Sequence, residues 1–186
     1  MKLSHWINRS AAAHPDVGNA LIETRHLAAS ITGLSPTQQR IHDPELSADT
    51  VAVLDALAAR LHSGEPLAYL LGNQPFYGLD LTVNRATLIP RSDSEAVVER
   101  ALHHLRGIAC PTVLDLGTGS GALALAIAKN RPDADVSGSD QSMAALAVAT
   151  ENARRLGISN IHFRHGDWLV PFADESAGLI ISNPPY

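Results

Sequence analysis

The sequence has little sulfur and few aromatic rings. Its 186 residues include one cysteine, Cys110, so no disulfide can form within the chain, as expected for the reducing cytoplasm. No run approaches the roughly 18 consecutive apolar residues of a membrane-spanning helix. The first ten residues carry Lys2 and Arg9 and are not followed by the apolar run of a signal peptide. We therefore expect a cytoplasmic protein with no membrane partner.

An excess of positive charge is also lacking, because 14 Lys and Arg residues stand against 19 Asp and Glu, a net charge of -5. Nucleic acids are usually held by a basic surface, so we expect no direct nucleic-acid contact. The nine histidines show no His-Glu-x-x-His spacing and no cysteine-rich pattern. We expect no bound metal.

The residues that are present predict three segments. Apolar positions recur every three or four residues over residues 20–31 and 51–61, so residues 1–63 are predicted to form a small all-helical domain. Gly33 is expected to end one helix, and Ser35-Pro36 and Ser47 to begin two others.

Prolines and glycines then interrupt short runs of β character over residues 64–91, namely 67–71, 76–77 and 79–83. This pattern predicts a β-hairpin linker. Ser92 or Ser94 is expected to cap the next helix, which extends through Leu105.

Residues 92–186 alternate between strand and helix, which favours βαβ units and a parallel sheet. Because doubly wound sheets usually have more strands, we expect the last strands to be missing from this chain. The predicted strands are 112–116, 134–138, 161–164 and 178–182, and the predicted helices between them are 121–129 and 142–156.

A glycine-rich loop follows the first of these strands. Gly117, Gly119 and Ala122 satisfy the G-x-G-x-x-G/A pattern of dinucleotide-binding proteins. The same stretch, from Asp115 to Gly121, also resembles the D-x-G-x-G-x-G motif of Rossmann-like methyltransferases, whose loop wraps the amino-acid and ribose parts of S-adenosylmethionine. The loop alone leaves the cofactor open. Its candidate cofactor-binding residues are Asp115, Gly117, Thr118, Gly119 and Gly121.

Acidic residues follow the next two strands. Asp140, about 20 residues past the loop, is placed to accept hydrogen bonds from ribose hydroxyls of either cofactor, or to cap the next helix. In a methyltransferase, Asp167 would accept from the adenine amino group with Trp168 near the ring. The alternative is a turn aspartate beside a core tryptophan.

The chain ends with Asn183-Pro184-Pro185-Tyr186, directly after a buried strand. Ligands of open α/β sheets bind at such carboxyl ends, and the prolines fix the backbone. An amide nitrogen is a poor nucleophile because its lone pair is delocalised. The Asn183 side-chain oxygen and the Pro184 carbonyl could accept both N–H protons and aim the lone pair at the methyl group. Tyr186 could pack against the planar group.

This tetrapeptide strongly resembles the Asn/Asp-Pro-Pro-Tyr/Phe element of amino methyltransferases, an element for which dehydrogenases have no use. The resemblance implies S-adenosylmethionine as cofactor. The fold it implies is α/β, a Rossmann-like class I methyltransferase sheet preceded by the helical domain and the hairpin linker. It makes Asn183, Pro184 and Tyr186 candidate catalytic residues, and Asn183 also a cofactor neighbour.

The linker stretches 64–72, 76–78 and 88–95 resemble the release-factor glutamine methyltransferases, the HemK-like family. That resemblance implies methylation of the glutamine in the Gly-Gly-Gln motif of peptide chain release factors, with the helical domain helping to dock them. The family has a further proline where this chain has Ser92. The implied substrate-binding residues are Phe76, Tyr77, Asn183, Pro184, Pro185 and Tyr186.

Several alternatives remain at this stage. The related methyltransferases of ribosomal protein L3 share many of these elements, and nucleic-acid amino methyltransferases acting on adenine N6 or guanine N2 share the tetrapeptide. An inactive truncated fragment is a third alternative. Phe76 and Tyr77 could be hairpin core, and Arg91 could simply pair with Glu95 at the surface. We expect a monomer.

Overall fold

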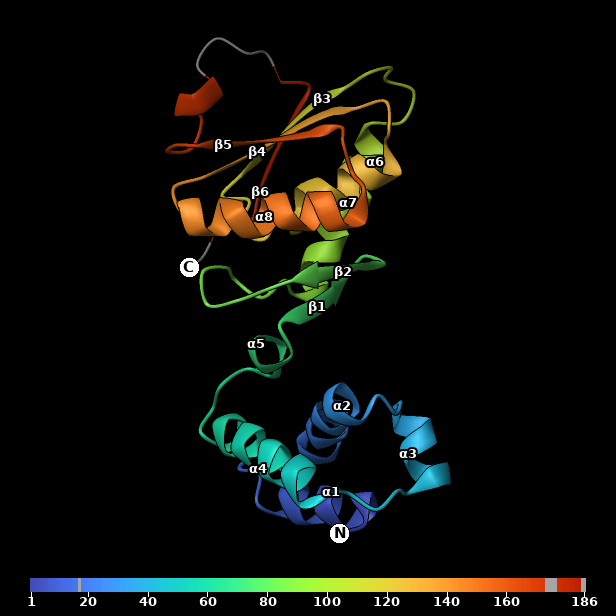
Figure 1. Cartoon of the computed structure of the whole chain (residues 1–186). Helices are drawn as coiled ribbons and strands as arrows, with labels where there is room; N and C mark the ends of the chain where they lie inside the picture. Colours follow the sequence, from blue (N-terminus) through green and yellow to red (C-terminus); the bar gives the residue numbers. More distant parts are fainter. Residues whose placement is uncertain (17, 173–176, 185–186) are drawn as a thin grey trace. The chain divides into compact units, whose positions relative to one another are not determined.

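The structure is a computed structural model that describes residues 1–16, 18–172 and 177–184. The chain divides into two compact units, Met1–Leu71 and Gly72–Tyr186, seen in Figure 1. The segment expected to be a separate linker is shared between them, since residues 64–71 belong to the first unit and residues 72–91 to the second. Each unit has its own hydrophobic core.

The first unit is all-helical, as predicted, with Trp6, Leu27 and Leu54 buried at its centre. Gly33 ends the second helix with a left-handed φ of 69°. Ser35 and Gln38 form a reciprocal capping box at the start of the third helix. The helices are α1 (Leu3–Ala12), α2 (Ala20–Thr32), α3 (Pro36–His42), α4 (Ala48–His62) and α5 (Leu67–Leu71).

Helix α5 corrects the sequence prediction, which gave residues 67–71 β character. The Pro66 carbonyl accepts hydrogen bonds from Tyr69 N at 3.0 Å and Leu70 N at 3.3 Å, so a helical turn begins there. Leu67, Leu70 and Leu71 pack against the core of the first unit. Their spacing of three and four residues suits one helix face, and in so short a run it could not be distinguished from a strand by sequence alone.

The second unit begins with the predicted hairpin, β1 (Asn73–Phe76) paired antiparallel with β2 (Leu79–Thr82). Its two turn residues, Tyr77 and Gly78, have φ values of 47° and 74°. Two positive φ angles in a two-residue loop are typical of the type I′ turn, whose twist matches that of the strands.

The parallel sheet is also confirmed. Its strand order is β5-β4-β3-β6, and each neighbouring pair runs parallel. The strands are β3 (Thr112–Leu116), β4 (Asp135–Asp140), β5 (Ile161–His165) and β6 (Leu179–Ser182). The helices of this unit are α6 (Glu95–His104), α7 (Ala122–Asn130) and α8 (Met143–Leu156), with short 3₁₀ turns η1 (Ser92–Ser94) and η2 (Val170–Phe172).

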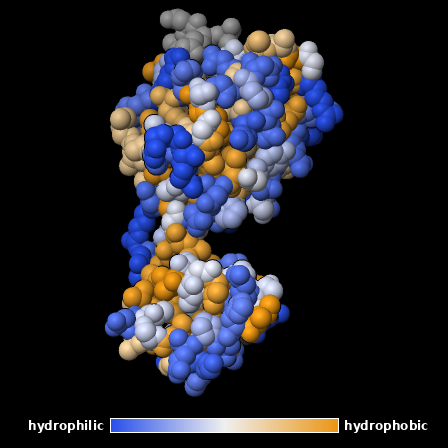
Figure 2. Space-filling model, turned by 45° about the vertical axis from the view of Figure 1, so that its right-hand side comes forward, coloured by the Kyte–Doolittle hydropathy of each residue, from blue (hydrophilic) through white to orange (hydrophobic). Residues whose placement is uncertain are grey.

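The two faces of the sheet are covered differently. Helices α7 and α8 lie against one face (Figure 1), where Val113 and Val136 form the main core with residues 122–128 of α7, all of which are buried. On the other face Leu114 and Leu116 pack with Phe172 of η2. Figure 2 shows hydrophilic residues over much of the visible surface, with hydrophobic ones between them. In the described parts of the chain, no helix is both long and apolar enough to cross a bilayer.

The start of α6 departs from the prediction. Neither Ser92 nor Ser94 caps the helix: Ser94 occupies the N-cap position, but its side chain makes no capping hydrogen bond. A serine at this position usually accepts from a first-turn N–H group. Its hydroxyl is directed to another partner, described below.

Candidate active site

The glycine loop is held against the carboxyl end of β4. The N–H groups of Gly117 and Thr118 both donate to the Ser139 carbonyl at 2.8 Å. Gly117, Gly119 and Gly121 all have positive φ angles, of 72°, 57° and 83°. L-residues other than glycine rarely adopt such angles, so the loop needs glycine at all three positions.

The three glycines differ in what surrounds them. A Cβ atom on Gly121 would lie 2.9 Å from Leu125 Cδ1 and 3.3 Å from Ala149 Cβ, so this glycine lets α7 and α8 pack closely. A Cβ on Gly117 or Gly119 would meet nothing within 4 Å. Both line an open cavity. Two of the glycines therefore face the space available to a ligand, and the third serves packing.

Asp140 joins the loop to the next helix. Its Oδ2 accepts from Gly119 N at 2.9 Å, and its Oδ1 accepts from Ser142 N at 2.8 Å. Ser142 itself caps α8 by accepting from Ala145 N. Asp140 is thus not the helix cap considered as its alternative role, and its position beside Gly119 suits a ribose-binding carboxylate.

Asp115 is the buried acid of the site, with 1% of its surface exposed. Its Oδ2 accepts from the Thr118 hydroxyl at 2.7 Å. Burial raises the pKa of Asp115 from 3.8 to about 6, with the nearby charge of Asp140 adding to the rise and the Thr118 hydrogen bond opposing it. In the free protein the pKa of this carboxyl is therefore about 6.

This titration predicts a stability difference. A carboxyl whose pKa is higher in the folded state stabilises the fold below its unfolded pKa, and that contribution is lost as pH rises through the folded pKa. The shift of Asp115 from 3.8 to about 6 corresponds to about 3 kcal/mol. We expect the stability of Asp115→Asn relative to wild type to increase between about pH 4 and pH 6 and to level off above that. Urea unfolding at several pH values measures this, and a pH-independent difference would contradict it.

Asp167 and Trp168 lie beyond the end of β5. The Gln141 side-chain amide donates to Asp167, and the Ser139 hydroxyl donates to the Trp168 carbonyl at 3.0 Å. Trp168 is 52% exposed and has a φ of 44°. It is therefore not a core tryptophan, which was the alternative interpretation. Both residues lie outside the lining of the cavity, near the same strand ends as Asp140.

The cavity brings the loop and the final motif together. In the parallel register Ser182 of β6 faces Leu116 of β3, and the Ser182 hydroxyl donates to the Leu116 carbonyl at 2.7 Å. This pairing places Asn183 beside the start of the glycine loop. The cavity contains about 400 Å³ of empty space, including its open mouth. It is lined by Phe76, Leu88, Pro90, Ser94, Asp115, Gly117, Thr118, Gly119, Ser120, Ala122, Leu123 and Asn183.

The side-chain amide of Asn183 has a defined partner. Its Nδ2 donates to the Ser94 hydroxyl oxygen at 2.9 Å. Since an amide presents its nitrogen and oxygen on opposite sides, the side-chain oxygen faces away from Ser94. Pro184 is partly buried, whereas Pro185 and Tyr186, also predicted site residues, lie outside the described residues.

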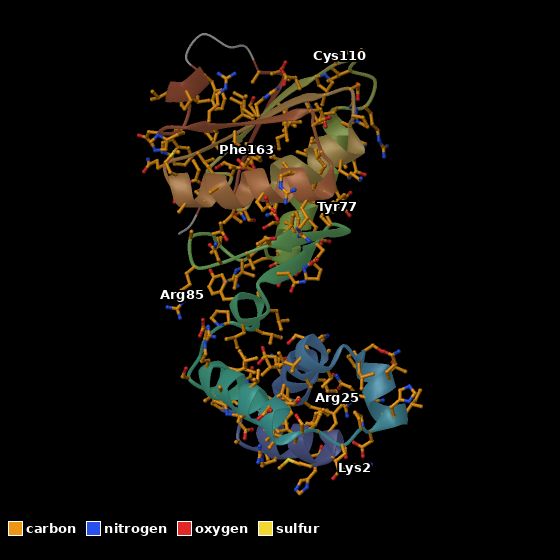
Figure 3. The ribbon with its side chains drawn as sticks, in the orientation of Figure 1. Lys2, Arg25, Tyr77, Arg85, Cys110 and Phe163 are labelled. Atoms are coloured by element: carbon orange, nitrogen blue, oxygen red, sulfur yellow. The ribbon has the colours of Figure 1, made fainter. Side chains whose placement is uncertain are left out.

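The hairpin contributes one side chain, Phe76, to the lining of the cavity. Phe76 is 2% exposed and belongs to the main core while also lining the cavity. Tyr77, labelled in Figure 3, packs partly buried against the same core. Its main-chain N–H donates to Glu95 Oε1 at 2.8 Å. Glu95 therefore anchors the hairpin turn and is not simply a surface partner of Arg91, as considered from the sequence.

One buried residue of the second unit was missed entirely from the sequence. Asn152 of α8 is fully buried and donates from Nδ2 to the carbonyls of Thr82, at 3.0 Å, and Ser120, at 2.9 Å. Its Oδ1 accepts from Thr82 N at 2.7 Å. It ties the hairpin to the glycine loop. The contacts of Ser94 with Asn183 and of Glu95 with Tyr77 were also not predicted from the sequence. For Asn152 the one available signal was a polar residue on an otherwise apolar helix face.

The fold and this site define a class I S-adenosylmethionine-dependent methyltransferase. The family model described as "Methyltransferase small domain" matches residues 97–186. A solved S-adenosylmethionine-dependent methyltransferase from Agrobacterium tumefaciens superposes with a TM-score of 0.52 and 18% identity, covering 61% of this chain and 39% of that one. At that identity the likeness concerns the fold.

The second family model is described as "PrmC N-terminal domain" and matches residues 3–72. The release factor glutamine methyltransferase of Yersinia pestis is 41% identical over 187 residues, covering 100% of this chain and 67% of the relative. That of Bordetella pertussis is 46% identical over 173 residues, covering 92% and 64%. The chain belongs to the release factor glutamine methyltransferase family, and it spans about two thirds of the length of these relatives.

Proposed function

We propose that this protein transfers a methyl group from S-adenosylmethionine to the side-chain amide nitrogen of the glutamine in the Gly-Gly-Gln motif of peptide chain release factors. One observation carries the proposal: the amide of Asn183 lines the same cavity as Gly117 and Gly119, with its nitrogen already bonded to Ser94. Its oxygen is thereby available to a substrate N–H group beside the cofactor loop.

The residues present fit the cofactor. Gly117 and Gly119 leave open space where a side chain would obstruct a ligand, and Asp140 keeps acceptor capacity for ribose hydroxyls beyond its two backbone bonds. Asp115 and Thr118 complete the loop wall, and we assign Asp167 and Trp168 to the adenine end. When bound, S-adenosylmethionine supplies a methyl group on a sulfonium, which needs no further activation.

The protein has to turn a weakly nucleophilic amide into a methyl acceptor. The Asn183 oxygen and the Pro184 carbonyl would accept the two N–H protons of the glutamine side chain. Those hydrogen bonds orient the nitrogen lone pair and become stronger as positive charge develops on nitrogen. No side chain has to remove a proton before the attack. The products are N5-methylglutamine, S-adenosylhomocysteine and one proton, which leaves the nitrogen once the N–CH₃ bond has formed and the S–CH₃ bond has broken.

The apolar part of the cavity lining suits an aliphatic side chain. Phe76, Leu88 and Pro90 form it, and apolar walls with a few placed polar groups are usual for small binding sites. We assign Phe76 and Tyr77 to substrate binding. Pro185 and Tyr186 keep that assignment from the motif alone, because they lie outside the described residues.

The cofactor assignment predicts a loss of binding in Asp140→Ala. This change removes the acceptor of the Gly119 and Ser142 N–H groups as well as the ribose contacts, and hydrogen bonds to charged groups contribute about 1.5–3 kcal/mol each. We expect calorimetry to give an S-adenosylmethionine affinity reduced about 50-fold or more. Asp135→Ala, at the exposed opposite end of the same strand, is the matched control and should bind as wild type does.

The substrate assignment is tested by mass spectrometry of a release factor incubated with the protein and S-adenosylmethionine. We expect a gain of one methyl group on the Gly-Gly-Gln glutamine, and none on a release factor with that glutamine changed to alanine. Methylation of ribosomal protein L3 or of a nucleic acid, with none on release factors, would replace this proposal by one of the alternatives.

The proposed function has consequences for where the protein works and what it binds. Release factors act on ribosomes, so we place the protein in the cytoplasm, and we assign the helical unit to docking the release factor. We propose that it works as a monomer without direct contact to nucleic acid. Its acidic balance of charge, -5, supports that last assignment.

A further inference from the structure

We infer that Ser94 is a positioning residue that sets the orientation of the Asn183 side-chain amide, so that the amide oxygen and not the nitrogen meets the substrate. The inference rests on the proposed function for its catalytic consequence. Its structural basis is the hydrogen bond from Asn183 Nδ2 to Ser94 Oγ, 2.9 Å long, which joins residues 89 positions apart in the chain.

Ser94 is placed where a serine would ordinarily stabilise its own helix. It occupies the N-cap position of α6, with φ -72° and ψ -14°, yet its hydroxyl makes no bond to the first turn. Serine at an N-cap usually contributes about 1 kcal/mol through that bond. Here the hydroxyl faces the cavity and accepts from Asn183. A helix-capping role therefore does not account for this serine.

The orientation matters because the two ends of an amide have opposite hydrogen-bonding character. An amide turned by 180° would present an NH₂ group to the N–H protons of the substrate glutamine, which is donor against donor. In the observed contact the Ser94 hydroxyl accepts from the Asn183 N–H. Turning the amide would require that hydroxyl to change from accepting to donating a hydrogen bond. The observed contact favours the productive orientation before any substrate arrives.

The support for Ser94 comes from its neighbours. The η1 turn holds it, with Ser94 N donating to the Arg91 carbonyl at 3.0 Å. The next residue, Glu95, accepts from Tyr77 N at 2.8 Å and so fixes the hairpin turn. Two consecutive side chains thus attach the beginning of α6 to the hairpin and to the end of β6. Ser94 is held on both sides and can orient Asn183 with little loss of side-chain freedom.

The first test is steady-state methyl transfer to a release factor by Ser94→Ala, with Ser94→Thr as the conservative variant that keeps the hydroxyl. We expect kcat to fall about tenfold in Ser94→Ala, with KM for the release factor and affinity for S-adenosylmethionine within twofold of wild type. Ser94→Thr should retain most of kcat. Ser92→Ala, in the same turn and exposed, is the matched control and should be unaffected. Equal rates for wild type and Ser94→Ala would overturn the inference.

A second test separates orientation from general structure. A carboxylate has two equivalent acceptor oxygens, so turning it changes nothing. In the Asn183→Asp background we therefore expect Ser94→Ala to reduce kcat less than twofold. In the wild-type background, where Asn183 is present, the same substitution is expected to reduce kcat tenfold. The same tenfold loss in both backgrounds would mean that Ser94 does not act through the orientation of the amide.

A third measurement does not depend on the substrate. In ¹⁵N-asparagine-labelled protein, the Asn183 side-chain NH₂ signals, assigned from their absence in Asn183→Asp, should exchange slowly with water in wild type and rapidly in Ser94→Ala. Unchanged exchange would overturn the inference. If release factors are not methylated at all, the proposed function fails, while this exchange difference still decides whether Ser94 holds Asn183.

Discussion

Replacing Asn183 by alanine is expected to reduce the rate of methyl transfer about 10³-fold while leaving the protein folded. The variant loses the acceptor for one substrate N–H proton, so the glutamine nitrogen is no longer held with its lone pair toward the methyl group. Loss of one placed hydrogen-bonding group at a reacting centre commonly costs 10²–10³ in kcat. Single-turnover assays with saturating S-adenosylmethionine isolate this step from binding and product release.

The control is Asn183→Asp, which keeps an acceptor oxygen at the same place and should transfer methyl groups faster than the alanine variant. Calorimetry should give S-adenosylmethionine affinities within about fivefold of wild type for both. Should the alanine variant keep a rate within threefold of wild type, Asn183 would not be the group that orients the substrate, and the proposed mechanism would be wrong.

The second large effect is expected for Asn152→Ala. The substitution removes the partner of two Thr82 backbone groups and of the Ser120 carbonyl. A polar group left without a partner in the interior costs about 1–3 kcal/mol. Allowing for water reaching the partly buried Thr82 groups, we expect the free energy of unfolding to fall by about 3–4 kcal/mol. Urea denaturation followed by circular dichroism measures it.

Thr150→Ala, on the exposed side of the same helix, is the matched control and should change the free energy of unfolding by less than about 0.5 kcal/mol. Because Asn152 also holds the glycine loop, S-adenosylmethionine should rescue part of the lost stability. A loss below 1 kcal/mol in Asn152→Ala would mean that the three backbone groups find other partners, and that the link between hairpin and loop is not important for the fold.

The fold followed from the sequence where local signals were strong. Alternating strands and helices in residues 112–182 predicted the parallel sheet, and Gly33, Ser35 and Ser47 marked helix ends that the structure confirms. Residues 67–71 were wrong because five residues are too few for a helical period to be distinguished from a strand. In that segment the packing of the leucines against the helical core favours the helix.

The site followed less completely. The glycine loop, Asp140 and Asn183 could be picked out because each follows a strand at the edge where ligands bind. Their partners could not, since the bonds Ser94–Asn183 and Asn152–Thr82 join residues 89 and 70 positions apart. Sequence spacing contains no information on such contacts. Ser94 was instead assigned the role that its local surroundings favour, that of a helix cap.

The adjacency of Ser94 and Glu95 restricts how this segment of the family can diverge. One residue bonds the asparagine of the methyl-acceptor motif and the next bonds the hairpin turn, so an inserted or deleted residue between them would turn the second side chain away by about 100° of helix rotation. A substitution at either position affects one contact, whereas a change of length between them alters the relation of the two. A residue inserted or deleted between the two is therefore expected to break one of these contacts.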